Sequence, residues 1–185
     1  MQLTFVTAPL SMLICLDTHI PFPRPLVYAT YRDKLTELVP YMSKIRQIKF
    51  KSSQEQDELL YLVHDWYGGA NIPALARAFL SEDLLNWTED SIWNNSEYTT
   101  TWHINTHVFT EAVRCTGKNQ FFEDDKGTLI QSRGELIIDP QQIKGTPQQL
   151  TVAIARVIEN SLGKQIAPNF QQMSVGVCNY LKENF

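Results

Sequence analysis

Alternating hydrophobic and polar positions first appear in the stretch LSMLICLDTHI, residues 10–20. Asp17 and His19 fall on one parity, whereas the apolar side chains share the other: Leu10, Met12, Ile14, Leu16 and Ile20. A period of two residues predicts a β-strand with one buried face. The apolar run MQLTFVTAP before it is read as part of the same strand.

Short helices are predicted after this strand. The segment PFPRP ends the strand, and Pro25 suits the first turn of a helix. The sequence LVYATYRDKLTELVPYM at 26–42 then reads as two short helices, or as one helix bent near Pro40. The segment PALARAFL at 73–80 has the composition of a further short helix.

The middle of the chain reads as a run of antiparallel strands. KIRQIKFKS at 44–52 alternates, and DELLYLVHDWY at 57–67 is apolar on both faces, as a central strand would be. NWTEDSIW and EYTTTWHIN flank the turn residues Asn94–Asn95, which predicts a hairpin. EAVRCTGKNQFF and TLIQSRGELIID flank the turn DDKG and give a second strand pair. On the last strand, Gly134 removes a side chain where a helix could approach closely.

One long helix is predicted for the C-terminal part of the chain. Thr146 is the expected N-cap, Pro147 suits the first helical position, and Gln149 completes a capping box. Apolar residues recur at helical spacing from Leu150 to Leu181, and the helix is expected to end near Lys182. Gly163 and Pro168 should bend it.

The order of these elements indicates an α+β fold in a single domain, residues 1–185. Hydrophobic residues make up 43% of the chain and charged residues 19%, which is typical of a globular protein. The net charge is -4 and the chain has no run of basic residues that could bind phosphate groups, so nucleic-acid binding is not expected. Cys15, Cys115 and Cys178 are far apart, which favours buried free thiols in a reducing compartment.

A cytoplasmic location is expected from the N-terminal sequence. A secretory signal would carry a positive charge before its apolar run, but no Lys or Arg precedes Arg24. The apolar run is also short and interrupted by Pro9, so it does not predict a membrane-spanning helix.

The stretch EDSIWNNSEYTTTWHINTH at 89–107 gathers aromatic and histidine residues, but its spacing does not predict a metal site. On a strand, His103 and His107 would lie roughly 13 Å apart, and Trp102 would point inward while His103 points outward. The sequence has no GxSxG and no glycine-rich phosphate loop. No metal and no cofactor are therefore expected.

Four tryptophans lie on or beside the predicted strands: Trp66, Trp87, Trp93 and Trp102. Each of them alone would ordinarily fill the core. Together, on a curved sheet beneath a long apolar helix, they could line a pocket. Glu89, Asp65 and Arg114 are candidates to orient the head of a ligand, although surface exposure is the usual position of such residues.

Several stretches of the chain resemble a known superfamily. The element order and PFPRPLVYATYRDKLTELVPYMSKIRQIKF resemble the START-related, birch-pollen-allergen-like domains of the SRPBCC superfamily. A similarity to bacterial START-like families of undefined function is carried by PALARAFL…WTEDSIWN together with KGTLIQSRGELII. A similarity to PRELI/MSF-type phospholipid-transfer proteins is carried by EDSIWNNSEYTTTWHIN. The resemblance implies a helix-grip fold, in which a curved antiparallel sheet wraps around the C-terminal helix and encloses a hydrophobic cavity.

Three functions follow as hypotheses. The first is binding, or transfer, of a hydrophobic small molecule or lipid, with transient membrane contact and an unassigned oligomeric state. The second is a cyclase or aromatase-type enzyme, for which His64 is the candidate polar group in the cavity because it shares a parity with Trp66. The third is a structural or partner-binding protein whose cavity is filled by its own side chains. The predicted cavity wall is Trp66, Trp87, Trp102, Ile104, Ile130, Leu136, Ile158, Leu162, Ile166 and Phe170.

Overall fold

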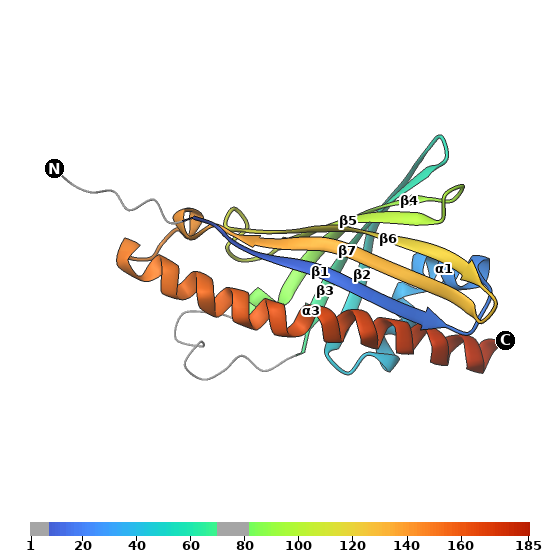
Figure 1. Ribbon diagram of the computed structural model, residues 1–185. Helices are drawn as coiled ribbons and strands as arrows, with labels where there is room; N and C mark the ends of the chain where they lie inside the picture. The colour runs from blue at the N-terminus through green and yellow to red at the C-terminus, as the bar shows by residue number, and fades with distance from the viewer. Residues whose placement is uncertain (1–7, 70–81) are drawn as a thin grey trace.

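The computed structural model describes residues 8–69 and 82–185, and within them seven antiparallel strands form one sheet (Figure 1). The spatial order is β1-β7-β6-β5-β4-β3-β2. The strands are β1 (Leu10–Ile20), β2 (Ile45–Gln56), β3 (Leu59–Gly68), β4 (Asn86–Asn94), β5 (Thr99–Thr106), β6 (Val113–Asp124) and β7 (Gly127–Ile138). The sequence therefore predicted seven strands within the described ranges. The segment 57–67, which was expected to be a central strand, forms β3 beside the edge strand β2, and burial alternates along it.

The first and last strands of the chain are neighbours. β1 pairs with β7 along its whole length, from Leu10 opposite Ile138 to Ile20 opposite Thr128. The other strands pair with the strand that follows them in the chain, which leaves β1 and β2 at the two edges. One face of the sheet carries most of the buried side chains, as the alternating burial along β1, β3 and most of β7 shows, whereas the edge strand β2 is exposed over most of its length.

Two short helices follow β1, as the sequence predicted. The first is α1 (Arg24–Asp33), and the second is the 3-10 helix η1 (Leu35–Tyr41), which contains Pro40. They separate at Lys34 rather than at the proline. Short 3-10 turns also precede β4 (η2, Glu82–Leu85) and follow β7 (η3, Pro140–Gln142).

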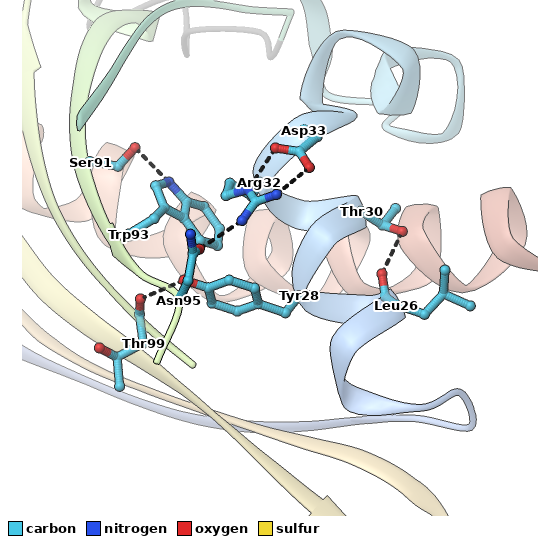
Figure 2. A network of polar contacts seen from close by, with 9 residues as sticks. All are labelled: Leu26, Tyr28, Thr30, Arg32, Asp33, Ser91, Trp93, Asn95 and Thr99. Carbon is cyan, nitrogen blue, oxygen red and sulfur yellow. Dashed lines mark hydrogen bonds and ion pairs between the residues drawn. The ribbon is translucent and has the colours of Figure 1, made fainter. Parts of the chain in front are cut away.

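Helix α1 is tied to the hairpin of β4 and β5 by polar contacts (Figure 2). Tyr28 Oη donates to the carbonyl of Thr99 at 3.2 Å. Arg32 donates to Asn95 Oδ1 at 2.7 Å and also pairs with Asp33. These contacts hold the helix against one end of the sheet, over aromatic side chains from β4 and β6.

Helix α3 (Gln148–Asn184) runs along the sheet as one helix of 37 residues that continues through Gly163 and Pro168 (Figure 1). The predicted capping box is wrong. Pro147 itself has extended dihedral angles and occupies the N-cap, and the hydroxyl of Thr146 points to the Lys144 carbonyl instead. Proline can take this position because its fixed φ suits extended backbone as well as the first helical turn.

The buried hydrophobic side chains form two clusters, and α3 contributes to both. The first cluster includes Ile14, Trp102, Leu136, Ile138, Ile154, Ala155 and Ile158. The second cluster includes Tyr28, Leu38, Trp93, Phe121, Ile130, Val177 and Leu181. Between these anchors, no residue of α3 from 159 to 173 is fully buried.

Some sequence predictions lie outside the described residues, and others differ from the structure at single residues. The predicted helix at 73–80 and the start of the first strand at residues 1–7 lie outside the described residues. Tyr98 was expected on β5, but it lies in the preceding turn with φ of 51°. Of the three cysteines expected to be buried, Cys115 is buried, Cys178 is partly buried and Cys15 is exposed.

Candidate ligand-binding cavity

A cavity of about 140 Å³ lies between the sheet and the middle of α3, with side chains of both clusters in its wall. The part of α3 that lacks fully buried residues forms one side of it. The wall is almost entirely apolar or aromatic. Its described residues are Tyr31, Leu35, Met42, Ile45, Trp66, Leu84, Leu85, Trp87, Glu89, Trp93, Thr100, Trp102, Ile104, Thr106, Val113, Cys115, Asn119, Leu136, Leu162, Gln165, Ile166, Asn169, Phe170 and Met173.

The predicted wall residues divide into two groups. The structure brings most of them together around the cavity: Trp66, Trp87, Trp102, Ile104, Leu136, Leu162, Ile166 and Phe170. Ile130 and Ile158 are not among the described lining residues. They are buried in the second and first clusters, respectively, and each of these clusters contains residues of both the sheet and α3.

Trp102 shapes the cavity floor by lying over two glycines. Gly117 and Gly134 are paired across β6 and β7, and Gly117 is also opposite Trp102 on β5. A Cβ atom at either glycine would meet the Trp102 ring closer than 3.0 Å. The prediction that Gly134 lets a helix approach is therefore wrong, since the space is taken by an indole ring.

Two further tryptophans stack on the neighbouring strands. The rings of Trp66 and Trp87 are nearly parallel, with centroids 5.5 Å apart, because the two residues are directly paired across β3 and β4. The indole N–H groups of both are buried without a hydrogen-bond partner among the described residues. Trp102, by contrast, donates to Asn119 Oδ1 at 3.1 Å.

Glu89 is an ionisable side chain in this apolar wall. On β4 it shares a face with Trp87, and its cross-strand neighbours are His64 on β3 and Ile104 on β5. No hydrogen bond or ion pair joins its carboxyl group to any residue of 8–69 or 82–185. Burial, followed by the nearby charge of Asp90, raises the pKa of Glu89 from the usual 4.5 to about 7.

Glu89 was only a minor candidate from the sequence, because a lone glutamate is usually a surface residue. The signal that could have found it is its parity, which it shares with Trp87, Ser91 and Trp93. Asp65 and Arg114 were candidates of equal standing, but both point away from the cavity. Asp65 accepts a hydrogen bond from Thr88 at 2.6 Å, and Arg114 lies near Glu135 at 3.8 Å with an exposed side chain.

His64, the candidate polar group of the enzyme hypothesis, is buried beside Glu89 but is not among the described lining residues. Its ring contacts Phe50, with centroids 5.6 Å apart, and its Nδ1 has no hydrogen-bond partner within the described part of the chain. Burial lowers the pKa of His64. Of these two neighbouring residues, it is Glu89 rather than His64 that lines the cavity.

The thiol of Cys115 also lines the cavity, opposite Ile104 on the adjacent strand. Burial, together with the nearby Glu89, raises the pKa of Cys115 to about 12. The thiol therefore stays protonated at neutral pH and is a poor nucleophile. Cys115 acts here as a small apolar wall residue.

Replacing Glu89 with glutamine should stabilise the protein at pH 8 by about 2 to 3 kcal/mol and have little effect at pH 4. The pKa of Glu89 is raised in the folded state, so the wild type loses stability as the pH rises from about 4.5 to about 7. Glutamine removes that loss because it carries no charge at either pH. Urea unfolding at both pH values would measure the difference.

Glu97→Gln provides the matched control, since Glu97 is exposed in the turn between β4 and β5. This variant should change the free energy of unfolding by less than about 0.5 kcal/mol at either pH. A Glu89→Gln effect that is the same at pH 4 and pH 8 would contradict the desolvated position of the carboxyl group.

Comparisons with known proteins support the fold. No protein-family model and no curated protein sequence matches the chain. The Zhui aromatase/cyclase from Streptomyces sp. R1128 is similar with a TM-score of 0.61 and 8% identity, covering 92% of this chain and 94% of that one. Ara h 8.0201 has a TM-score of 0.59 and 12% identity, with 94% and 99% covered. A norcoclaurine synthase from Thalictrum flavum has a TM-score of 0.51 and 11% identity, with 86% and 98% covered.

The similarity to these solved structures extends over most of each chain, so it concerns the whole architecture, sheet and C-terminal helix together. In the described part of this chain, no helix combines the length and apolar character needed to cross a membrane. The identities are low, so the likeness concerns the architecture and leaves the narrower resemblances to START-like and PRELI/MSF-type families as predictions. The chain has the birch-pollen-allergen-like helix-grip fold, and its cavity lies where a helix-grip sheet and its C-terminal helix separate.

Proposed function

We propose that the protein, acting as a single domain, binds a hydrophobic small molecule or one end of a lipid-like molecule in this cavity. The observation that carries the proposal is the cavity itself, an apolar space of about 140 Å³ lined by aromatic side chains. A cavity filled by the protein's own side chains, as in the partner-binding hypothesis, would leave no such space. The proposal includes the cytoplasmic location expected from the sequence.

The size of the cavity limits what fits without rearrangement. An engineered apolar cavity of about 150 Å³ in another protein binds benzene, so this space suits a ligand part of about one ring. Enclosing about 200 Å² of apolar ligand surface would contribute about 5 kcal/mol before the cost of ordering. A longer chain would need α3 to move away from the sheet.

Movement of α3 is favoured by how the helix is held. Its two ends are anchored in the two hydrophobic clusters, whereas its middle borders the cavity. Pro168 lies in that middle part and has no backbone N–H to donate to the preceding turn. The middle of the helix can therefore yield more easily than its ends.

An enzyme is the second candidate, because an acid or base that reaches the bound molecule is present in Glu89. Its pKa near neutrality would allow the carboxyl group to take or give a proton at working pH. The aromatase/cyclase and norcoclaurine synthase among the fold relatives are named as enzymes. The fate of a bound ligand separates the candidates, since a binding protein returns it chemically unchanged.

Filling the cavity should strongly weaken ligand binding. We expect native mass spectrometry and calorimetry to detect at least one of toluene, indole and decanol on the wild type. Leu162→Trp places a larger ring in the cavity wall and should weaken that binding at least 10-fold. Extracting the ligand after long incubation shows whether it has been altered.

Val157→Trp is the control, because Val157 is on the same helix but is 38% exposed. This variant should bind within about 2-fold of the wild type. If the wild type binds none of the three compounds, or if both variants lose binding equally, the cavity is not the binding site.

A further inference from the structure

We propose that the ligand carries a basic nitrogen, which the carboxyl group of Glu89 holds inside the cavity. This inference rests on the proposed function and names the chemical class of the ligand. It makes the protein selective for amines over neutral and acidic compounds of the same shape.

The position of Glu89 carries the inference. Its side chain belongs to a row that crosses the sheet on the cavity face, with Ile104 and Cys115 on one side and His64 on the other. Trp87 lies next to it along the strand. Glu89 is partly exposed, but most of its neighbours are apolar, so its carboxyl group is poorly solvated, and no positively charged residue of the described wall compensates for its charge.

The described wall contains no lysine and no arginine. The residues that α3 contributes opposite the sheet are Leu162, Gln165, Ile166, Asn169, Phe170 and Met173, which are all uncharged. Burying an ionised carboxylate without a partner is strongly unfavourable, while a carboxylate paired with a cation in a water-poor site is favourable. A protonated amine on the ligand supplies the cation that these wall residues do not.

The uncompensated carboxyl group of Glu89 also excludes an acidic ligand head. A second carboxylate beside Glu89 would repel it, so a fatty acid should enter this cavity poorly or leave its head outside. A neutral alcohol could accept a hydrogen bond from protonated Glu89, and this is the alternative that the test must separate.

The pH dependence of binding separates the amine from the alcohol. Among the described residues, the ionisable groups that face or adjoin Glu89 are His64 on β3, Asp90 on β4 and Cys115 on β6. An amine needs the carboxylate form, so its affinity should rise from pH 5.5 to pH 8. An alcohol held by the protonated acid should show the opposite trend.

The experiment uses benzylamine, benzyl alcohol, benzoate and toluene as probes of similar shape. Each is titrated by calorimetry into the full chain at pH 5.5 and pH 8, for the wild type and for Glu89→Gln. Glutamine keeps the size of the side chain and removes its charge, and unchanged toluene binding in the variant shows that its cavity is intact.

We expect the wild type at pH 8 to prefer benzylamine to benzyl alcohol by at least 10-fold and to bind benzoate most weakly. Glu89→Gln should reduce that preference to less than about 2-fold. Toluene binding without an amine preference, or a preference that persists in Glu89→Gln, overturns the amine inference alone. Failure of every probe to bind the wild type overturns the proposed function as well.

Discussion

Replacing Phe121 with alanine should lower the free energy of unfolding by about 3 to 5 kcal/mol. Phe121 on β6 is 1% exposed and lies at the centre of the second cluster. Its ring has edge contacts with Tyr28 and Tyr31 of α1, at centroid distances of 5.2 and 5.5 Å. The surrounding side chains are fixed on a strand and on a helix, so they cannot move in to fill the space that the phenyl ring leaves. The alanine variant should therefore contain a cavity. Urea unfolding monitored by circular dichroism would measure the loss.

Phe122→Ala is the control for this change. Phe122 is the next residue, points to the other face of the sheet and is 37% exposed. Its truncation should cost about 1 to 2 kcal/mol, clearly less than that of Phe121, since part of its ring already contacts water and its removal leaves no enclosed cavity. Equal losses at the two positions would mean that the second cluster does not depend on Phe121.

Placing a methyl group at Gly117 should destabilise the protein by about 3 kcal/mol or more. The new Cβ would meet the ring of Trp102 and lie only 2.5 Å from the carbonyl oxygen of Arg133. Neither can move freely, because the ring is part of the first cluster and the carbonyl belongs to β7. Gly117→Ala should therefore displace Trp102, with a lower unfolding midpoint and altered tryptophan fluorescence.

Gly163→Ala tests whether the loss at Gly117 is specific to its site. The nearest atom to a Cβ at Gly163 is the sulfur of Met12 at 3.0 Å, on a flexible side chain. Alanine also has a higher helix propensity than glycine by about 1 kcal/mol. This variant should be neutral or stabilising, and a loss equal to that of Gly117→Ala would show that the Trp102 contact is unimportant.

The strands and their buried faces could be predicted from the sequence, because apolar residues at every second position mark the face of a strand that is buried. Trp102 inward and His103 outward follow from alternation alone, and the structure confirms both positions. The helix-grip architecture followed from the element order and the family resemblance. These features depend on local pattern, which a single sequence displays.

The details of the cavity depend on long-range packing and could not be predicted. Ile130 and Ile158 have the right parity for the wall, yet whether helix and sheet touch or separate at a given residue depends on the size of every neighbour. Gly134 is a second example. The space above this glycine is filled by the Trp102 ring from β5 and not by the helix, which the sequence could not show. Glu89 was visible by parity, but only the structure shows that no described cation accompanies it.

The pairing of β1 with β7 and the position of α3 bear on how the chain reaches its native state. Contacts across more than a hundred residues make folding slow, because a long loop must close before they form. During synthesis, the apolar face of the sheet stays uncovered until α3 has been made, and its 37 residues take about 2 to 7 s at ordinary ribosome speeds. The nascent chain therefore presents an open hydrophobic surface at the ribosome, where chaperones can recognise it before the helix closes over the sheet.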